Sequence, residues 1–164
     1  MIDLSSSALL LSLSTTDNIF SMRKAKAAVL SKEEKLKIEE TLRNALKKHS
    51  EISFAYLHGS FIKNEGFKDI DLAVYAKEMP FSLLQYELSL ETEIMEQIGR
   101  YIVDVRILNS SPLSFRFNVI RDGIVLFVRN DDERVEFQEA TIRDYLDFAY
   151  YRELYVKETL GHGV

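Results

Sequence analysis

The sequence predicts a single α+β domain in which helices pack on a small mixed sheet. Helix signals with recognisable caps alternate with short runs of β-forming residues, and no repeat or low-complexity linker divides the chain. The length of 164 residues suits one domain. A composition of 46% hydrophobic and 29% charged residues is ordinary for a globular protein with a real core.

The first helix is predicted by a capping box, in which Ser31 supplies a hydroxyl cap and Glu34 follows three residues later. This helix is expected to end near His49. Its apolar residues recur near helical spacing and are Leu36, Leu42, Ala45 and Leu46. Residues 52–58 are apolar and rich in β-forming residues, which predicts a buried strand that ends at Gly59.

A strand, a helix and another strand are predicted in the middle of the chain. Residues 70–76 have the composition of a strand, which Pro80 ends. Residues 81–98 follow as a helical stretch, with Gly99 as its C-cap. The candidates for the buried face of this helix are Leu84, Leu88, Met95 and Ile98. Residues 101–108 are predicted to form the next strand.

The last third of the chain predicts a short helix, a strand and a long helix. Pro112 suits the first turn of a helix that runs to about Arg121. A strand over residues 124–128 follows, and Asp131 begins the final helix. Much of the apolar surface of this helix comes from Val135, Ile142, Leu146, Phe148, Tyr151 and Leu154. Its aromatic residues predict core packing, and any excess beyond what one face can bury would mark a partner surface.

The N-terminal residues 1–21 are rich in serine and threonine and predict a loose arm. Their most apolar part, residues 8–13, is too short for a membrane span, which needs about 20 residues. No basic residue precedes Arg23, so a signal peptide is not expected. We hypothesise that translation starts at Met22, which intact-mass measurement of the natively expressed protein would test, and that residues 22–164 form the domain.

The charge and cysteine content exclude several functional classes. The formal net charge of −5 argues against a general nucleic-acid binder, which needs a basic surface, and direct nucleic-acid binding is not expected. The absence of cysteine excludes disulfides and thiolate-bound metal sites, which fits the cytoplasm. A metal-dependent enzyme for phosphate substrates stays open, because divalent cations neutralise phosphate locally.

Two aspartates stand at the start of the second predicted strand. Asp69 and Asp71 are two residues apart, and residues i and i+2 of a strand point to the same face. Aspartate is disfavoured in strands and rarely buried without a partner. Two carboxylates this close repel each other and raise one pKa unless a cation lies between them. Oxygen ligands of this kind suit magnesium or manganese.

Asp104 repeats this anomaly in the middle of the third predicted strand, among apolar neighbours. If adjacent strands bring the three carboxylates together, they could hold two metal ions. A two-metal site clamps the attacking and leaving oxygens of an in-line phosphoryl displacement. The three aspartates together therefore predict a site for phosphoryl chemistry.

Gly59 and Ser60, directly after the first strand, have the properties of a phosphate-binding turn. Glycine lets the backbone approach a phosphate closely. If Ser60 begins a short helix, its free N–H groups face the same anion, and its hydroxyl adds a donor. A Gly-Ser pair is common on its own. It is informative here because it stands nine residues before the first aspartate of the Asp69-x-Asp71 strand. His58, just before the pair, is expected at the edge of the core.

Three motifs in this order resemble those of the DNA polymerase β-like nucleotidyltransferases: His58-Gly59-Ser60, Asp69-Ile70-Asp71-Leu72 and Val103-Asp104-Val105. The resemblance runs from about Ile52 to Tyr155 and includes the acidic helix around residues 144–148. Within that superfamily the chain resembles the minimal nucleotidyltransferases (MNT), specifically the MNT-type antitoxins encoded beside HEPN-domain toxins. The resemblance implies the polymerase β-like fold.

The same resemblance implies the roles of the acidic residues. Asp69 and Asp71 would be metal ligands. Asp104 would complete the second metal site and help to deprotonate the attacking hydroxyl, so that all three aspartates are catalytic. The implied cofactors are two Mg²⁺ ions, with Mn²⁺ as an alternative, and ATP would be the substrate.

The resemblance also implies the nucleotide-binding residues. Gly59 and Ser60 would bind the β- and γ-phosphates, and Lys63, where the family often has an arginine, would add positive charge. Two departures predict a tighter phosphate loop: only eight residues separate the Gly-Ser pair from Asp69, and Lys63-Asn64 replaces Arg-Gly. Nucleotide preference therefore stays open. The intact carboxylates favour a working enzyme over an inactive scaffold.

The implied reaction moves AMP from ATP onto a hydroxyl, with pyrophosphate leaving. The implied acceptor is a tyrosine of a partner HEPN toxin, whose ribonuclease activity adenylylation would silence. Two alternatives stay open: a non-catalytic antitoxin that acts by binding alone, and a small-molecule nucleotidyltransferase, whose kind usually carries an additional domain. No membrane partner is expected, and a homo-oligomer is left open.

The candidate site residues also have simpler interpretations. Asp69 and Asp71 could be solvated aspartates in a turn that enters a strand. Asp104 could face water on an edge strand and form a weak surface ion pair with Arg106. Lys63 could be an ordinary exposed lysine.

Overall fold

The computed structural model describes residues 28–63, 66–78 and 82–159. In chain order its elements are α2 (Lys32–Lys47), β1 (Ile52–His58), β2 (Asp69–Ala76), α3 (Leu83–Ile98), β3 (Ile102–Ile107), the short 3-10 helix η1 (Leu108–Ser110), α4 (Leu113–Asp122), β4 (Ile124–Val128) and α5 (Asp131–Thr159). The helices and strands expected from Ser31 onward are present. The expected arm over residues 1–21, with the hypothesised start at Met22, lies outside the described residues.

The four strands form one mixed sheet in the order β3-β2-β1-β4. Strand β1 pairs antiparallel with β2 on one side and with β4 on the other. Strand β3 pairs parallel with β2, and α3 makes the crossover between these two strands. The expected α+β architecture with a small mixed sheet is confirmed.

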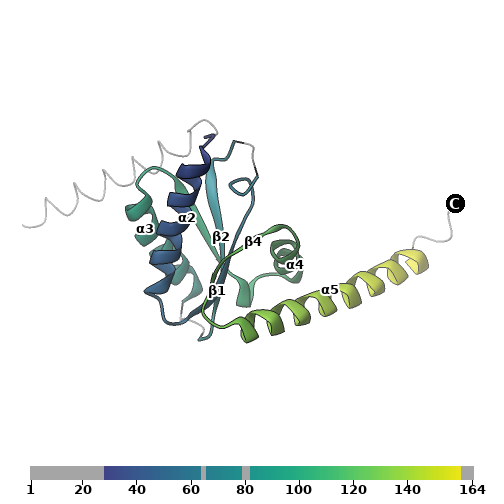
Figure 1. Ribbon diagram of the computed structural model, residues 1–164. Helices are drawn as coiled ribbons and strands as arrows, with labels where there is room; N and C mark the ends of the chain where they lie inside the picture. Colours follow the sequence, from purple (N-terminus) through teal and green to yellow (C-terminus); the bar gives the residue numbers. More distant parts are fainter. Residues whose placement is uncertain (1–27, 64–65, 79–81, 160–164) are drawn as a thin grey trace, which may run out of the picture.

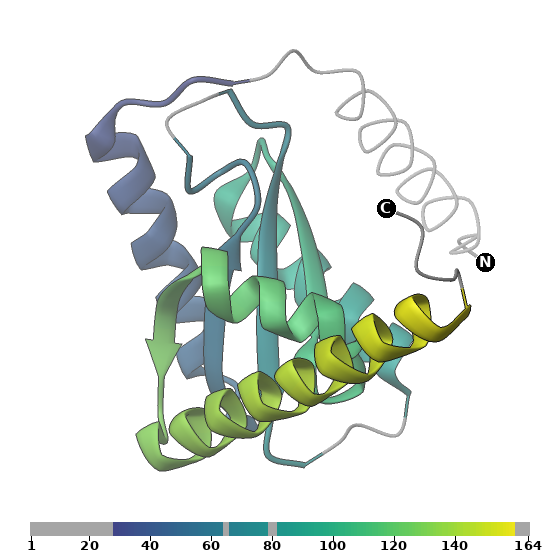
Figure 2. The ribbon, with the colours of Figure 1, turned by 90° about the vertical axis from the view of Figure 1, so that its right-hand side faces the viewer.

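Helices cover both faces of the sheet (Figures 1 and 2). Helices α2 and α3 bury the larger core, which includes Leu42, Leu46, Leu57, Leu72, Leu90, Ile94 and Val105. Helices α4 and α5 cover a smaller core made by Phe54, Tyr56, Ala73, Leu108 and Val119. Residues two apart in a regular strand face the same side. A register shift between Ile52 and Phe54 changes this, so that Ile52 faces the larger core and Phe54 faces the smaller core.

The predicted helix ends are confirmed. The backbone N–H of Glu34 donates to Ser31 Oγ at 3.2 Å, and Ser31 N–H donates to the Glu34 carboxylate at 2.9 Å. At the C-terminus of α3, Gly99 has a φ of 83° and its N–H donates to the carbonyl of Met95 at 2.7 Å. Both caps provide hydrogen bonds for backbone groups that have no partner within the helix at its ends.

The buried face of α3 matches the expected one only in part. Met95 and Ile98 pack against the larger core, as expected, and are partly buried. Leu84 and Leu88 are 63% and 52% exposed, whereas Leu90 and Ile94 are buried. The rotation has a polar cause: the Glu87 and Glu91 carboxylates accept hydrogen bonds from the outward-facing backbone N–H groups of Ile107 and Val105, both at 2.9 Å. The expectation for α2 was also wrong at Leu36, which is exposed.

Helix α5 is far less buried than expected. All six of its apolar residues named from the sequence are exposed, and Thr141 is its only fully buried residue among those described. The reason is geometric, because the N-terminal half of α5 packs on α4 and β1 while the remainder extends beyond the body of the protein (Figure 1). None of the described helices combines the length and the apolar character that a membrane span requires.

The core contribution of α2 can be tested with two leucines of the same helix. Leu42 is fully buried and Leu36 is 52% exposed. We expect Leu42→Ala to lower the free energy of unfolding by about 2–5 kcal/mol, because it leaves a cavity. The matched Leu36→Ala change should stay within about 0.5 kcal/mol. Urea unfolding followed by circular dichroism measures both, and equal losses would contradict this packing.

Candidate active site

Three neighbouring strands bring the acidic motif residues together at one end of the sheet. Asp71 is the register partner of His58 on β1 and of Asp104 on β3, so the three lie side by side across the sheet. Their neighbours in sequence, Ile70 and Val103 among them, point into the larger core. The aspartates therefore face the opposite side, which α4 and α5 cover, and Asp69 shares that face because it lies two residues before Asp71.

The turn after β1 contacts this acidic group directly. Gly59 has a φ of 72°, a conformation that L side chains rarely adopt. A Cβ atom placed on Gly59 would lie 1.9 Å from Asp71 Oδ2. The carboxylate therefore occupies the space that any other residue's side chain would fill. This close approach needs glycine for two independent reasons, the backbone conformation and the missing Cβ.

The Asp71 carboxyl is in an environment that disfavours its charge. Burial, together with the negative charges of Asp69 and Asp104, raises its pKa from the ordinary 3.8 to about 6. Desolvation and like charges act in the same direction on an acid. A cation placed among the three carboxylates would reverse both effects.

Asp104 has a counter-charge on its own strand. Arg106 Nε lies 3.1 Å from Asp104 Oδ1, and Arg106 Nη2 donates to Asp104 Oδ2 at 3.4 Å. Oδ1 is buried and accepts no hydrogen bond within the described part of the chain. Strand β3 is an edge strand, so the simpler interpretation of Asp104 as one half of an ion pair describes part of this geometry. That interpretation does not explain why Asp104 lies directly beside Asp71 in the register of β2 with β3.

The donor set fits a divalent cation, although the side chains are not arranged around one. Three carboxylates supply the oxygen atoms that Mg²⁺ and Mn²⁺ prefer. Besides burial, the negative charges of Asp69 and Asp104 contribute to the raised pKa of Asp71. Within residues 28–63, 66–78 and 82–159, no three acidic or histidine side chains converge on a common point. Since Arg106 holds Asp104, joining a metal site would require Asp104 to leave this ion pair.

A groove on the outer side of β3 extends from these carboxylates. It has a volume of about 340 Å³ and includes Asp69, Asp104, Arg106 and the α3 glutamates. Arg106 Nη1 also lies 3.8 Å from the Glu87 carboxylate, so a second acidic partner is within reach. Sequence reasoning did not assign Glu87 or Glu91 to the site. Their spacing of four residues shows a shared helix face but does not show which strand that face meets.

A separate pocket of about 230 Å³ lies beside the Gly59 turn, and its lining includes neither Ser60 nor any of the three aspartates. Its lining includes the predicted residues Gly59 and Lys63, together with residues that the sequence did not indicate: Phe115, Asn118, Val119 and Asp122 of α4. Lys63 is exposed. Hydrogen bonds from Arg121 lower the pKa of the Asp122 carboxyl, and the charge of Lys63 acts in the same direction. The pocket is therefore polar at its mouth.

Ser60 does not begin a helix, contrary to the condition considered from the sequence. The N–H of Lys63 donates to the carbonyl of Ser60 at 3.1 Å, which closes a single turn. His58, as expected, lies at the edge of the core, where its ring meets Phe115 edge to face at 5.4 Å. Burial lowers the pKa of the His58 imidazole, and the charge of Asp104 acts in the opposite direction.

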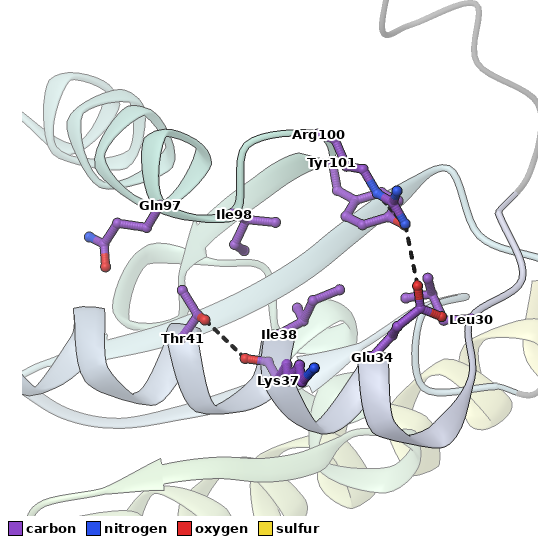
Figure 3. A pocket seen from close by; sticks show the side chains of 9 residues that line it. All are labelled: Leu30, Glu34, Lys37, Ile38, Thr41, Gln97, Ile98, Arg100 and Tyr101. Carbon is purple, nitrogen blue, oxygen red and sulfur yellow. Dashed lines mark hydrogen bonds and ion pairs between the residues drawn. The ribbon is translucent and has the colours of Figure 1, made fainter.

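A second hollow of about 230 Å³ lies between α2 and α3, and none of the predicted site residues lines it (Figure 3). Arg100 lies 3.6 Å from Glu34 across its mouth, and the Thr41 hydroxyl donates to the carbonyl of Lys37. These helices cover the face of the sheet away from the aspartates. This hollow is therefore separate from the candidate active site.

Comparison with known proteins identifies the family. The family model described as "Polymerase beta, Nucleotidyltransferase" matches residues 40–132, which contain the Gly59 turn and all three aspartates. The chain belongs to this nucleotidyltransferase family. No curated protein matches the chain.

Solved structures of the same fold come from toxin–antitoxin complexes. One is described as the tri-AMPylated Shewanella oneidensis HEPN toxin in complex with MNT antitoxin; the matching chain is 20% identical, with a TM-score of 0.61, over 77% of this chain and 99% of that one. A toxin–antitoxin structure with AMP-PNP matches at 21% identity and a TM-score of 0.62, over 75% and 98%. A MntA–HepT complex matches at 21% and 0.56, over 80% and 100%. The predicted polymerase β-like fold is confirmed.

The contact between Gly59 and Asp71 predicts different costs for two glycine substitutions. Gly59 and Gly99 both have positive φ, but no atom lies within 4 Å of a Cβ added at Gly99. We expect Gly99→Ala to cost about 1–2 kcal/mol of stability through its backbone conformation alone. Gly59→Ala should cost more, because the Asp71 carboxylate must also move. Urea unfolding at pH 7.5 compares them, and a smaller loss for Gly59→Ala would refute the contact.

The raised pKa of Asp71 predicts how stability depends on pH. The folded protein holds the Asp71 proton more tightly than the unfolded chain, so raising the pH from about 4 to about 6 should lower the free energy of unfolding through this group. We expect Asp71→Asn to be more stable than the wild type at pH 7.5, with the difference vanishing near pH 4.

Urea unfolding across this pH range provides the measurement. The matched control is Asp147→Asn, which removes an exposed carboxylate of α5. A stability difference between Asp71→Asn and the wild type that is the same at pH 4 and pH 7.5 would contradict the assignment.

Proposed function

We propose that this protein transfers AMP from ATP onto a hydroxyl, and that the acceptor is a tyrosine of a partner HEPN-domain toxin in the cytoplasm. The observation that carries the proposal is the placement of Asp69, Asp71 and Asp104 on one face of two paired strands, with Asp71 against the Gly59 turn. Membership of the nucleotidyltransferase family supports the reaction type. The toxin complexes of similar fold support the choice of partner.

In this proposal the chain's own residues bind and orient the two reactants. The turn at Gly59 and Ser60 receives the β- and γ-phosphates, and Lys63 adds positive charge at the mouth of the same pocket. The acceptor oxygen attacks the α-phosphorus, the bond from that phosphorus to the β-phosphate oxygen breaks, and pyrophosphate leaves. Asp104 receives the proton of the acceptor hydroxyl.

Two Mg²⁺ ions held by Asp69, Asp71 and Asp104 would supply charge neutralisation for the phosphates. Such catalysis consists mainly of positioning and electrostatic stabilisation. Arg106 has a supporting role, because it balances the charge of Asp104 until that carboxylate is needed. The Glu87 carboxylate, 3.8 Å from Arg106, provides a place for the released guanidinium.

The proposal is tested by combining the purified protein with ATP, Mg²⁺ and the product of the neighbouring gene. We expect mass spectrometry to show one or more AMP additions on that partner with the wild type. The double variant Asp69→Asn/Asp71→Asn should lower transfer by at least a hundredfold, since both candidate ligands are lost. Glu40→Gln, which changes an exposed carboxylate of α2, is the control and should leave transfer unchanged.

Other outcomes distinguish the alternatives. A tight complex without transfer from any of the four nucleotides would favour a non-catalytic antitoxin that acts by binding. Transfer to small hydroxyl compounds but not to the partner would favour a small-molecule nucleotidyltransferase. Equal transfer by the double variant and the wild type would remove the aspartates from the mechanism.

A further inference from the structure

Helix α5 has an apolar stripe that the other described residues, 28–63, 66–78 and 82–130, leave exposed. The stripe consists of Val135, Ile142, Leu146, Tyr150 and Leu154, each between 38% and 60% exposed. Successive members are seven, four, four and four residues apart, so they lie along one side of the helix. A row of this length on a surface helix is the pattern of anchors that a helix presents to a groove.

The contacts between α5 and the body involve the other side of the helix and its N-terminal half. Glu133 accepts a hydrogen bond from Ser53, Phe137 packs against Phe54, and Tyr145 stacks on Phe117 at 3.8 Å. From residue 146 to residue 159 every side chain except that of Ala149 is exposed. Figure 2 shows this part of the helix extending beyond the sheet and α4.

The free half of α5 is difficult to explain by its own stability. Isolated helices shorter than about 12–15 residues are marginal in water, and most helical stability in proteins comes from packing of an apolar face. The described elements of the body leave every side chain of residues 146–159 except that of Ala149 exposed, so they do not provide such packing. Exposed aromatic side chains add to the cost of leaving this surface in water, since Tyr151 and Tyr155 are each 68% exposed.

Charge distinguishes among possible occupants of this surface. Helix α5 contains nine acidic and four basic residues. The whole chain has 26 acidic and 21 basic residues, so the remaining sequence is balanced at 17 of each and α5 carries the entire net charge of −5. Exposed acidic residues adjoin the stripe: Glu139 lies three residues before Ile142, and Glu153 three residues after Tyr150.

We propose that the α5 stripe is the docking surface for a partner protein that presents an apolar groove with a rim of lysine and arginine. A second copy of this chain is the weaker choice, because pairing two α5 helices would bring two net charges of −5 together. A basic partner gains from the same charges, which also speed its association. In identifying this partner with the acceptor protein, the inference rests on the proposed function.

The test compares Leu146→Glu with Leu36→Glu, a change at a similarly exposed leucine on α2, where the wild-type residues are 59% and 52% exposed. Circular dichroism and thermal unfolding first establish that both variants fold. The probe is the neighbouring-gene product, whose dissociation constant is measured by calorimetry. We expect Leu146→Glu to weaken binding at least tenfold, as loss of a central anchor does, and Leu36→Glu to leave it unchanged.

The acidic side chains that adjoin the stripe are tested with the double variant Glu139→Lys/Glu153→Lys. We expect it to weaken binding several-fold at low salt and to reduce the loss of affinity between low salt and about 0.15 M ionic strength. Equal binding by Leu146→Glu and the wild type would overturn the docking surface. So would a wild-type dimer in sedimentation that Leu146→Glu dissociates, since a second copy would then cover the stripe.

The AMP-transfer assay separates this inference from the proposed function. Loss of the complex in Leu146→Glu, without AMP transfer by the wild type, would retain the docking surface and reject the transferase proposal. Unchanged AMP transfer by Leu146→Glu would retain the transferase proposal and reject the docking surface. If the wild type does not bind the neighbouring-gene product at all, that product is rejected as the partner in both the proposed function and the docking-surface proposal.

Discussion

The contact between the Asp71 carboxylate and the backbone of Gly59 is the constraint on which the candidate active site depends. It joins the turn after β1 to the start of β2, and the register of β1 with β2 and of β2 with β3 then fixes where His58 and Asp104 must lie. The phosphate turn and the carboxylates are therefore parts of one unit of backbone. Any shift of register by one residue would turn the aspartates into the larger core.

Burial and like charges both disfavour the ionised form of Asp71. Asp71 is half-buried beside two other carboxylates, and together these raise its pKa to about 6. Arg106 relieves part of the repulsion by pairing with Asp104. The site therefore combines one carboxylate whose charged form is disfavoured with another that already has a counter-charge.

The sequence was sufficient for the features that depend on local rules. The caps at Ser31 and Gly99 follow from local backbone chemistry, and the common face of Asp69 and Asp71 follows from strand periodicity. The alignment of Asp104 with Asp71 was predicted only as a condition, because parallel register depends on the crossover through α3. The roles assigned to the individual site residues remain predictions.

The errors concern features set by distant parts of the chain. Leu84 and Leu88 have helical spacing, but the sequence does not reveal that Glu87 and Glu91 turn α3 toward the β3 backbone. The exposure of α5 depends on how far α4 and β1 extend along it. A local sequence pattern does not give that distance. Likewise Asn118 and Asp122 join the pocket only because α4 packs across the end of β1.

The two glutamates of α3 also affect the behaviour of the protein in a crowded solution. An edge strand with free N–H groups is a template on which a strand from another molecule can add, and such addition leads to aggregation. Glu87 and Glu91 occupy two of these donors on β3, at Ile107 and Val105, and place negative charge along that edge. The outer side of β3 is thus closed to strand addition by a helix of the same chain, while the sheet remains open to small reactants at the end where the aspartates lie.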